Sequence, residues 1–150
     1  AFYMLWRYLG KKEFHKALEH YVQRWAQKHP TPYDFFFTFE DVLNKDLSWF
    51  WKPWFFEFGY PDLALTDVNQ TDNGTVVNIE KKGNLPVPVQ LEVTFGNGES
   101  NKYEKPLDVW KDGRTSIQIR IKNSESIKSI RLGSDQIPDT NRKDNKIIVN

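Results

Sequence analysis

The clearest pattern of hydrophobic and polar positions lies between residues 14 and 25, where large apolar side chains recur at helical spacing. Polar residues take the opposite face, so this stretch predicts an amphipathic helix. Its apolar stripe consists of Phe14, Leu18, Tyr21, Val22 and Trp25. The helix should end near Lys28, because Pro30 disfavours helical geometry in the residue before it. Gly10 should end an earlier helical segment that begins at Phe2.

An aromatic-rich segment follows at residues 30–56 and predicts two further helices. Thr31 and Asp34 have the spacing of a capping box, and Pro32 stands at the first helical position, where its missing N–H does no harm. Asp46 is the expected cap of the next helix. Pro53 should kink or shorten that helix, since it removes one backbone hydrogen bond.

The aromatic side chains of this segment allow two interpretations. Aromatic rings bury large areas, so the first is a core between short helices. The second is an exposed aromatic platform for a ligand. The run of phenylalanines favours the core, because phenylalanine has no polar group to keep in water.

Beyond Gly59 the composition changes to runs rich in Val, Ile and Thr between turn residues, which predict short antiparallel strands. The expected strands are residues 63–69, 75–81, 87–95, 102–109, 115–122, 126–132 and 146–149. Turn signals are Asp72-Asn73-Gly74, Gly96-Asn97-Gly98 and Lys111-Asp112-Gly113. The predicted fold is therefore α+β, with a short helical bundle at residues 1–60 followed by an immunoglobulin-like β-sandwich at residues 61–150.

The helical half resembles a known family of enzymes. Residues 28–56, KHPTPYDFFFTFEDVLNKDLSWFWKPWFF, look like the segment that closes the catalytic domain of the gluzincin zinc aminopeptidases, the family of aminopeptidase N and the leukotriene hydrolases. Residues 4–26, MLWRYLGKKEFHKALEHYVQRWA, resemble the helical pair before it. The resemblance covers about 60 residues. It implies a zinc-bound water that attacks the amino-terminal peptide bond of a peptide substrate in the intact enzyme.

The catalytic residues of that family cannot be placed on this chain. A zincin binds its ion through H-E-x-x-H, whereas His15 and His20 are five positions apart, roughly 140° around a helix. Tyr3 and Tyr8 do not fit the family's tyrosine motif, and His29 has no recognisable nucleophile or paired carboxylate beside it. We therefore assign no catalytic, cofactor-binding or metal-binding residue, and expect zinc only in a parent enzyme.

Composition excludes several other classes. The formal net charge is +1 with both signs interspersed, so nothing favours nucleic acid. Cysteine is absent, which excludes disulfides and thiolate sites. The longest apolar run is broken well short of the about 20 residues of a membrane span, so we expect a soluble chain. Ala1 enters a helical pattern without a signal peptide, which suggests a segment of a longer protein. The compartment stays open, with the periplasm and secretion among the options.

Two polar features allow other interpretations. The loop Asp139–Asn145 carries oxygen ligands for calcium, although it lacks an EF-hand pattern and could equally be a polar turn. Asn69-Gln70-Thr71 and Asn73-Gly74-Thr75 are glycosylation sequons, which matter only in a eukaryotic secretory route.

The sequence thus favours the carboxy-terminal part of a zinc aminopeptidase, inactive by itself. Its expected partners are the upstream catalytic domain of the same polypeptide and, in the intact enzyme, a peptide substrate. The helical half has more apolar surface than it can cover, so this surface should pack against either the sandwich or a second copy of the chain, and we favour self-association. The alternative is a non-catalytic module that binds protein or carbohydrate through Tyr103, Trp110 or a sheet edge.

Overall fold

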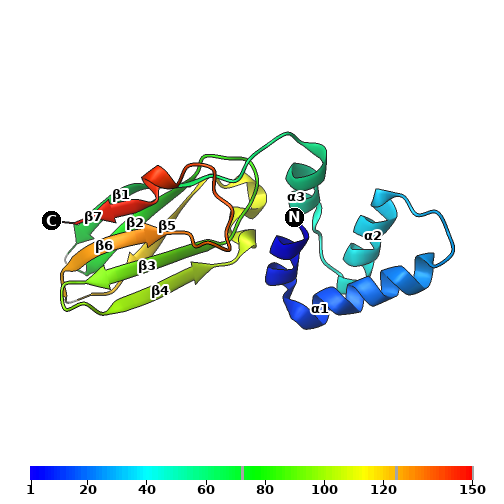
Figure 1. Cartoon of the computed structure of the whole chain (residues 1–150), viewed down its shortest axis with the longest axis horizontal. Coiled ribbons are helices and arrows are strands. Elements are labelled where there is room, and N and C mark those ends of the chain that lie inside the picture. Colours follow the sequence, from blue (N-terminus) through cyan, green and yellow to red (C-terminus); the bar gives the residue numbers. More distant parts are fainter. Residues whose placement is uncertain (72, 124, 150) are drawn as a thin grey trace. The chain divides into compact units, whose positions relative to one another are not determined.

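The computed structural model describes residues 1–71, 73–123 and 125–149. The chain divides into two compact units, Ala1–Glu57 and Phe58–Asn150 (Figure 1). The first unit consists of helices and the second of antiparallel sheets with short helical turns. This is an α+β chain, as the sequence predicts.

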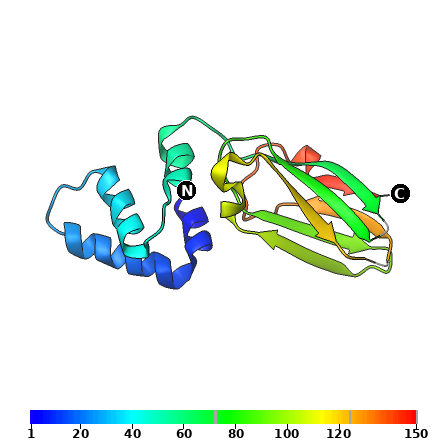
Figure 2. The ribbon, with the colours of Figure 1, turned by 180° about the vertical axis from the view of Figure 1, so that it is seen from behind.

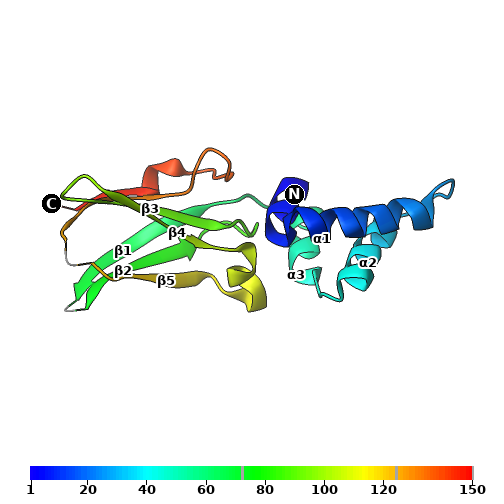
Figure 3. The same cartoon turned by 90° about the horizontal axis from the view of Figure 1, so that it is seen from below.

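Three α-helices and a π-helical turn form the described part of the first unit. These elements are α1 (Phe2–Trp25), α2 (Pro32–Leu43), α3 (Ser48–Trp51) and η1 (Lys52–Phe56). Gly10 interrupts α1 with φ 79° and ψ 159°, a conformation open almost only to glycine, so α1 is two helical segments joined at an angle. The predicted helix end at Gly10 is confirmed. The longer segment of α1 packs along α2 (Figure 3).

Local signals set the ends of the later helices. The main-chain N–H of Thr31 donates to Asp34 Oδ2 at 2.7 Å, which confirms the predicted capping box. Asp46 is not the cap of α3: Leu47 holds that position, and Asp46 Oδ1 accepts the N–H of Ser48 at 2.9 Å. The α-helical geometry stops before Pro53 and continues as the π-turn η1, because proline cannot donate the next backbone bond.

The aromatic side chains are divided between core and surface. Phe36, Phe39, Phe50 and Trp51 are buried, and the ring of Trp51 stacks on Phe36 with 4.7 Å between centroids. The core interpretation is therefore confirmed for these rings. Val22 is 57% exposed, so the prediction that it belongs to the buried stripe of α1 is wrong.

The second unit contains two antiparallel sheets that form two layers (Figure 3). The three-stranded sheet, seen from behind in Figure 2, has the order β1 (Leu63–Thr71), β2 (Gly74–Lys81), β5 (Ser116–Ile121). The four-stranded sheet has the order β4 (Ser100–Lys105), β3 (Val89–Phe95), β6 (Ile127–Leu132), β7 (Lys146–Ile148). Asp72, part of one predicted turn, lies outside the described residues.

Alternating side chains build the core between these sheets. In β3, Leu91 and Val93 are buried while Glu92 and Thr94 are half-buried, the pattern of a strand with one covered face. In β5, Ile119 and Ile121 are buried and Gln118 and Arg120 are exposed, as predicted.

The predicted strand at residues 102–109 is wrong in its second half. Strand β4 ends at Lys105, since Pro106 has no N–H for the ladder, and a 3-10 helix η2 (Leu107–Gly113) follows. This turn carries Trp110 into the core, where its indole N–H donates to the carbonyl of Val87 at 2.8 Å. A second 3-10 turn, η3 (Arg142–Asp144), precedes β7. Among the described residues, no helix is both long and apolar enough to cross a membrane.

Candidate functional site

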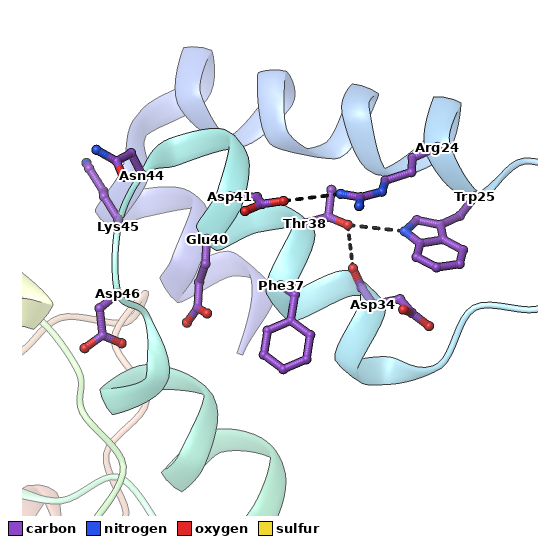
Figure 4. A pocket seen from close by; sticks show the side chains of 10 residues that line it. All are labelled: Arg24, Trp25, Asp34, Phe37, Thr38, Glu40, Asp41, Asn44, Lys45 and Asp46. Atoms are coloured by element: carbon purple, nitrogen blue, oxygen red, sulfur yellow. Dashed lines mark hydrogen bonds and ion pairs between the residues drawn. The ribbon is translucent and has the colours of Figure 1, made fainter.

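A hollow of about 690 Å³ lies in the helical unit, between the end of α1, helix α2 and the segment after α2 (Figure 4). Polar side chains dominate its lining. The lining residues are Arg24, Trp25, Asp34, Phe37, Thr38, Glu40, Asp41, Asn44, Lys45 and Asp46.

The hydroxyl of Thr38 lies between two helices and is already engaged. It accepts the indole N–H of Trp25 at 3.2 Å and donates to the main-chain carbonyl of Asp34 (Figure 4). Thr38 is buried; its bond to Trp25 links α1 to α2, and its bond to Asp34 lies within α2. A hydroxyl held in this way is a structural link and not a nucleophile next to a base.

The four carboxylates of the hollow also serve local structure. Asp34 belongs to the capping box, and Glu40 Oε1 accepts the N–H of Leu47 at 3.0 Å, which fixes the segment after α2. Asp41 pairs with Arg24 at 3.4 Å, an exposed contact that adds little stability. In the described part of the chain, the hollow has only two cations, Arg24 and Lys45, beside these four carboxylates. Its net negative charge therefore favours positively charged groups. The described lining holds no histidine, cysteine or serine and no pair suited to acid–base catalysis.

An apolar groove of about 190 Å³ shares Phe37 and Glu40 with this hollow. Its remaining lining residues are Tyr33, Phe36, Ser48, Trp51, Lys52 and Phe56. Tyr33, Phe37 and Phe56 are 53%, 62% and 52% exposed, and the rings of Tyr33 and Phe56 stack 5.5 Å apart. Neighbouring exposed rings of this kind are typical of an interaction surface. Exposed aromatic rings therefore lie beside the buried core.

The helical unit also contains the histidines and tyrosines to which the sequence assigned no catalytic role. His15, His20 and His29 are exposed. Tyr3 stacks on Trp6, and Tyr8 meets the edge of Trp49. In the described ranges, no group of three or more His, Cys, Asp or Glu side chains is arranged for a metal ion.

The two rings named for a binding module do not form a platform. Trp110 is buried and hydrogen-bonded, and Tyr103 is half-buried on the strand β4. The alternative of a protein- or carbohydrate-binding module is not favoured. Asn69 and Asn73, the sequon asparagines, are exposed.

The loop Asp139–Asn145 meets a residue that sequence reasoning missed. Asp62, to which no motif gave a role, is only 8% exposed, and Leu63 beside it donates its N–H to Asp139 Oδ2 at 3.1 Å. Burial raises the pKa of Asp62, and the carboxylates of Asp139 and Asp144 raise it further, while Lys82 opposes them. No local signal could have revealed this meeting, because the two segments lie 76 positions apart.

Comparison with known proteins gives the context for these units. No protein-family model matches the chain. The chain is 27% identical over 139 residues to a protein named "Probable aminopeptidase 2" from Sulfurisphaera tokodaii, which covers 89% of this chain and 16% of that protein. The fold of this chain is similar to that of Legionella pneumophila aminopeptidase A, whose structure was solved in complex with aspartic acid. The TM-score is 0.63 and the sequence identity is 19%. The match covers 87% of this chain and 15% of the Legionella chain. Both relatives are aminopeptidases. The chain spans about one sixth of their length.

Proposed function

We propose that this chain is the non-catalytic, carboxy-terminal part of a larger zinc-dependent aminopeptidase of the gluzincin type. The supporting observation is the similarity to "Probable aminopeptidase 2", which extends over 89% of this chain but only 16% of that protein. Residues 1–60 would close the catalytic domain, and residues 61–150 would form the domain after it. Zinc, its ligands and the peptide-binding site would belong to the upstream domain.

We propose further that the second unit is an immunoglobulin-like sandwich. The orders β1-β2-β5 and β4-β3-β6-β7 correspond to the A-B-E and C′-C-F-G arrangements of that fold. Consecutive strands also change sheet between β2 and β3 and between β4 and β5. Trp110, whose ring lies in the core, provides a large buried aromatic side chain, although it comes from a 3-10 turn.

The exposed rings of the helical unit suggest how this part contributes. Tyr33, Phe37 and Phe56 line a groove that the described unit leaves open. In the intact enzyme its proposed occupant is the upstream catalytic domain, so the chain would support the active site from outside. In the isolated chain a second copy would take that place.

Hydrolysis assays test the proposal directly. The 150-residue chain, with and without added zinc, is compared with a longer protein that carries the residues encoded upstream. We expect the chain alone to release no p-nitroaniline from aminoacyl p-nitroanilides, and the longer protein to do so in a chelator-sensitive manner. The upstream sequence should contain H-E-x-x-H followed by a helical glutamate. Chelator-sensitive hydrolysis by the chain alone, or an upstream sequence without that motif, would overturn the proposal.

A further inference from the structure

The loop Asp139–Asn145 is hydrogen-bonded to the residues on either side of Asp62, at the start of β1. The N–H of Thr140 donates to the carbonyl of Pro61 at 3.0 Å, and Asp139 Oδ2 accepts the N–H of Leu63 at 3.1 Å. Both chain neighbours of Asp62 are therefore bonded to this loop. The carbonyl of Asp62 accepts the N–H groups of Lys82 and Gly83 from another side.

Three oxygen atoms of this region are buried without a hydrogen-bond donor. Among the described residues, Asp62 Oδ1, Asp144 Oδ1 and Asn145 Oδ1 have no partner. The whole side chains of Asp62 and Asn145 are 8% and 4% exposed, so bulk water cannot satisfy them. An acceptor left in this state costs roughly 1–3 kcal/mol, and more when it is charged. Such a group in a folded protein indicates a missing water or ion.

The charges of the region add a second reason for a cation. The carboxylate of Asp139 lies next to Asp62 in space, since it accepts the N–H of Leu63, and the turn η3, which ends at Asp144, contacts β1. The ammonium of Lys82 is the nearby positive charge, and it bonds Glu80 at 2.6 Å instead of an aspartate. The ammonium of Lys82 therefore does not neutralise these aspartates through a hydrogen bond.

We propose that Asp62, Asp144 and Asn145 bind one calcium ion through these three oxygen atoms, with water completing its coordination. Asp139, whose two oxygens accept the N–H groups of Leu63 and Asn141, holds the loop in place beside the ion. Calcium fits because it takes six to eight oxygen ligands in flexible geometry, whereas magnesium demands a near-octahedral shell and zinc prefers nitrogen or sulfur.

The expected affinity is modest. Two carboxylates and an amide make a ligand set of low charge, comparable to extracellular calcium modules with dissociation constants on the order of 10⁻⁴ to 10⁻³ M. The ion would hold the loop on β1 and so stabilise the sheet unit. This inference does not depend on the proposed peptidase function.

Calcium titration of the full 150-residue chain tests the site, with calorimetry and the thermal midpoint as readouts. Wild type is compared with Asp62→Asn and Asp144→Asn, which keep the side-chain shape and remove the charge. The matched control is Asp135→Asn, an exposed aspartate nearby that pairs with Arg142 at 3.2 Å. We expect saturable binding of one calcium ion in wild type and control, and affinity reduced at least about tenfold in both test variants.

Three results would overturn the proposal. The first is no calcium binding by the wild type up to about 10 mM, well above the weakest constant of such modules. The second is unchanged affinity in Asp144→Asn. The third is equal stabilisation of wild type by magnesium, which would indicate charge screening. If Asp62→Asn does not fold, the calcium titration of the wild type still tests whether the site exists.

Discussion

At the scale of single residues, Trp51 illustrates how much one ring contributes to the helical unit. It is 4% exposed and contacts Phe36 and Phe39 with centroid distances of 4.7 and 6.2 Å. Trp51→Ala should lower the free energy of unfolding by about 3–5 kcal/mol, because it leaves a cavity among aromatic side chains. Urea denaturation followed by circular dichroism measures this. The control, Phe37→Ala, removes a ring that is 62% exposed and should cost far less; equal losses would contradict the assignment of the core.

Asp62 should make stability depend on pH when calcium is removed. Its pKa is raised in the folded chain, chiefly by burial and then by Asp139 and Asp144, against the effect of Lys82. The folded state therefore binds this proton more tightly than the unfolded chain does. That stabilisation is fully present below the ordinary pKa of an aspartate and is lost as pH rises through the raised pKa.

In EDTA, Asp62→Asn should consequently be more stable than wild type at pH 7 and similar to it at about pH 3, below the ordinary aspartate pKa. Thermal melts across this range measure the difference. Asp135→Asn, at an exposed position, serves as the control. If Asp62→Asn were less stable at pH 7, the ionised carboxylate would have to be stabilised by a partner that the described residues do not show.

At the scale of elements, the bend in α1 depends on Gly10. Its φ of 79° with ψ of 159° is costly for any residue with a side chain, although a Cβ there would have open space. Gly10→Ala should destabilise the helical unit by about 1–3 kcal/mol through backbone strain alone. Denaturation midpoints measure the effect against Lys12→Ala, an exposed site in the same helix. A loss no larger than that of the control would show that α1 can straighten without consequence.

Elements defined by local chemistry could be read from the sequence, and those defined by distant contacts could not. The capping box at Thr31, the end before Pro53 and the alternation in β3 and β5 depend on neighbours within a few positions. The local sequence predicts that Trp110 lies at the end of a strand. Its buried position instead depends on a hydrogen bond to the carbonyl of Val87, 23 positions away in the sequence. Asp62 was missed for the same reason, because its burial depends on the distant Asp139–Asn145 loop.

At the scale of the whole molecule, the open groove of the helical unit predicts association of the isolated chain. Tyr33, Phe37 and Phe56 leave aromatic surface in water that a second copy could cover. Light scattering at high micromolar concentration should therefore show dimers or larger species, and Phe37→Glu should shift them to monomer. Val22→Glu changes an equally exposed apolar residue outside the groove and should not. A wild-type monomer under these conditions would contradict the prediction.

The bonds between the Asp139–Asn145 loop and the residues on either side of Asp62 also bear on biosynthesis. A ribosome makes the start of β1 first and reaches the loop 76 residues later, about 4–15 seconds at rates of about 5–20 residues per second. Until then Leu63 has no acceptor from Asp139, and β1 can pair with β2 without being held at its beginning. The beginning of β1 should therefore be held in place only after translation has passed the loop.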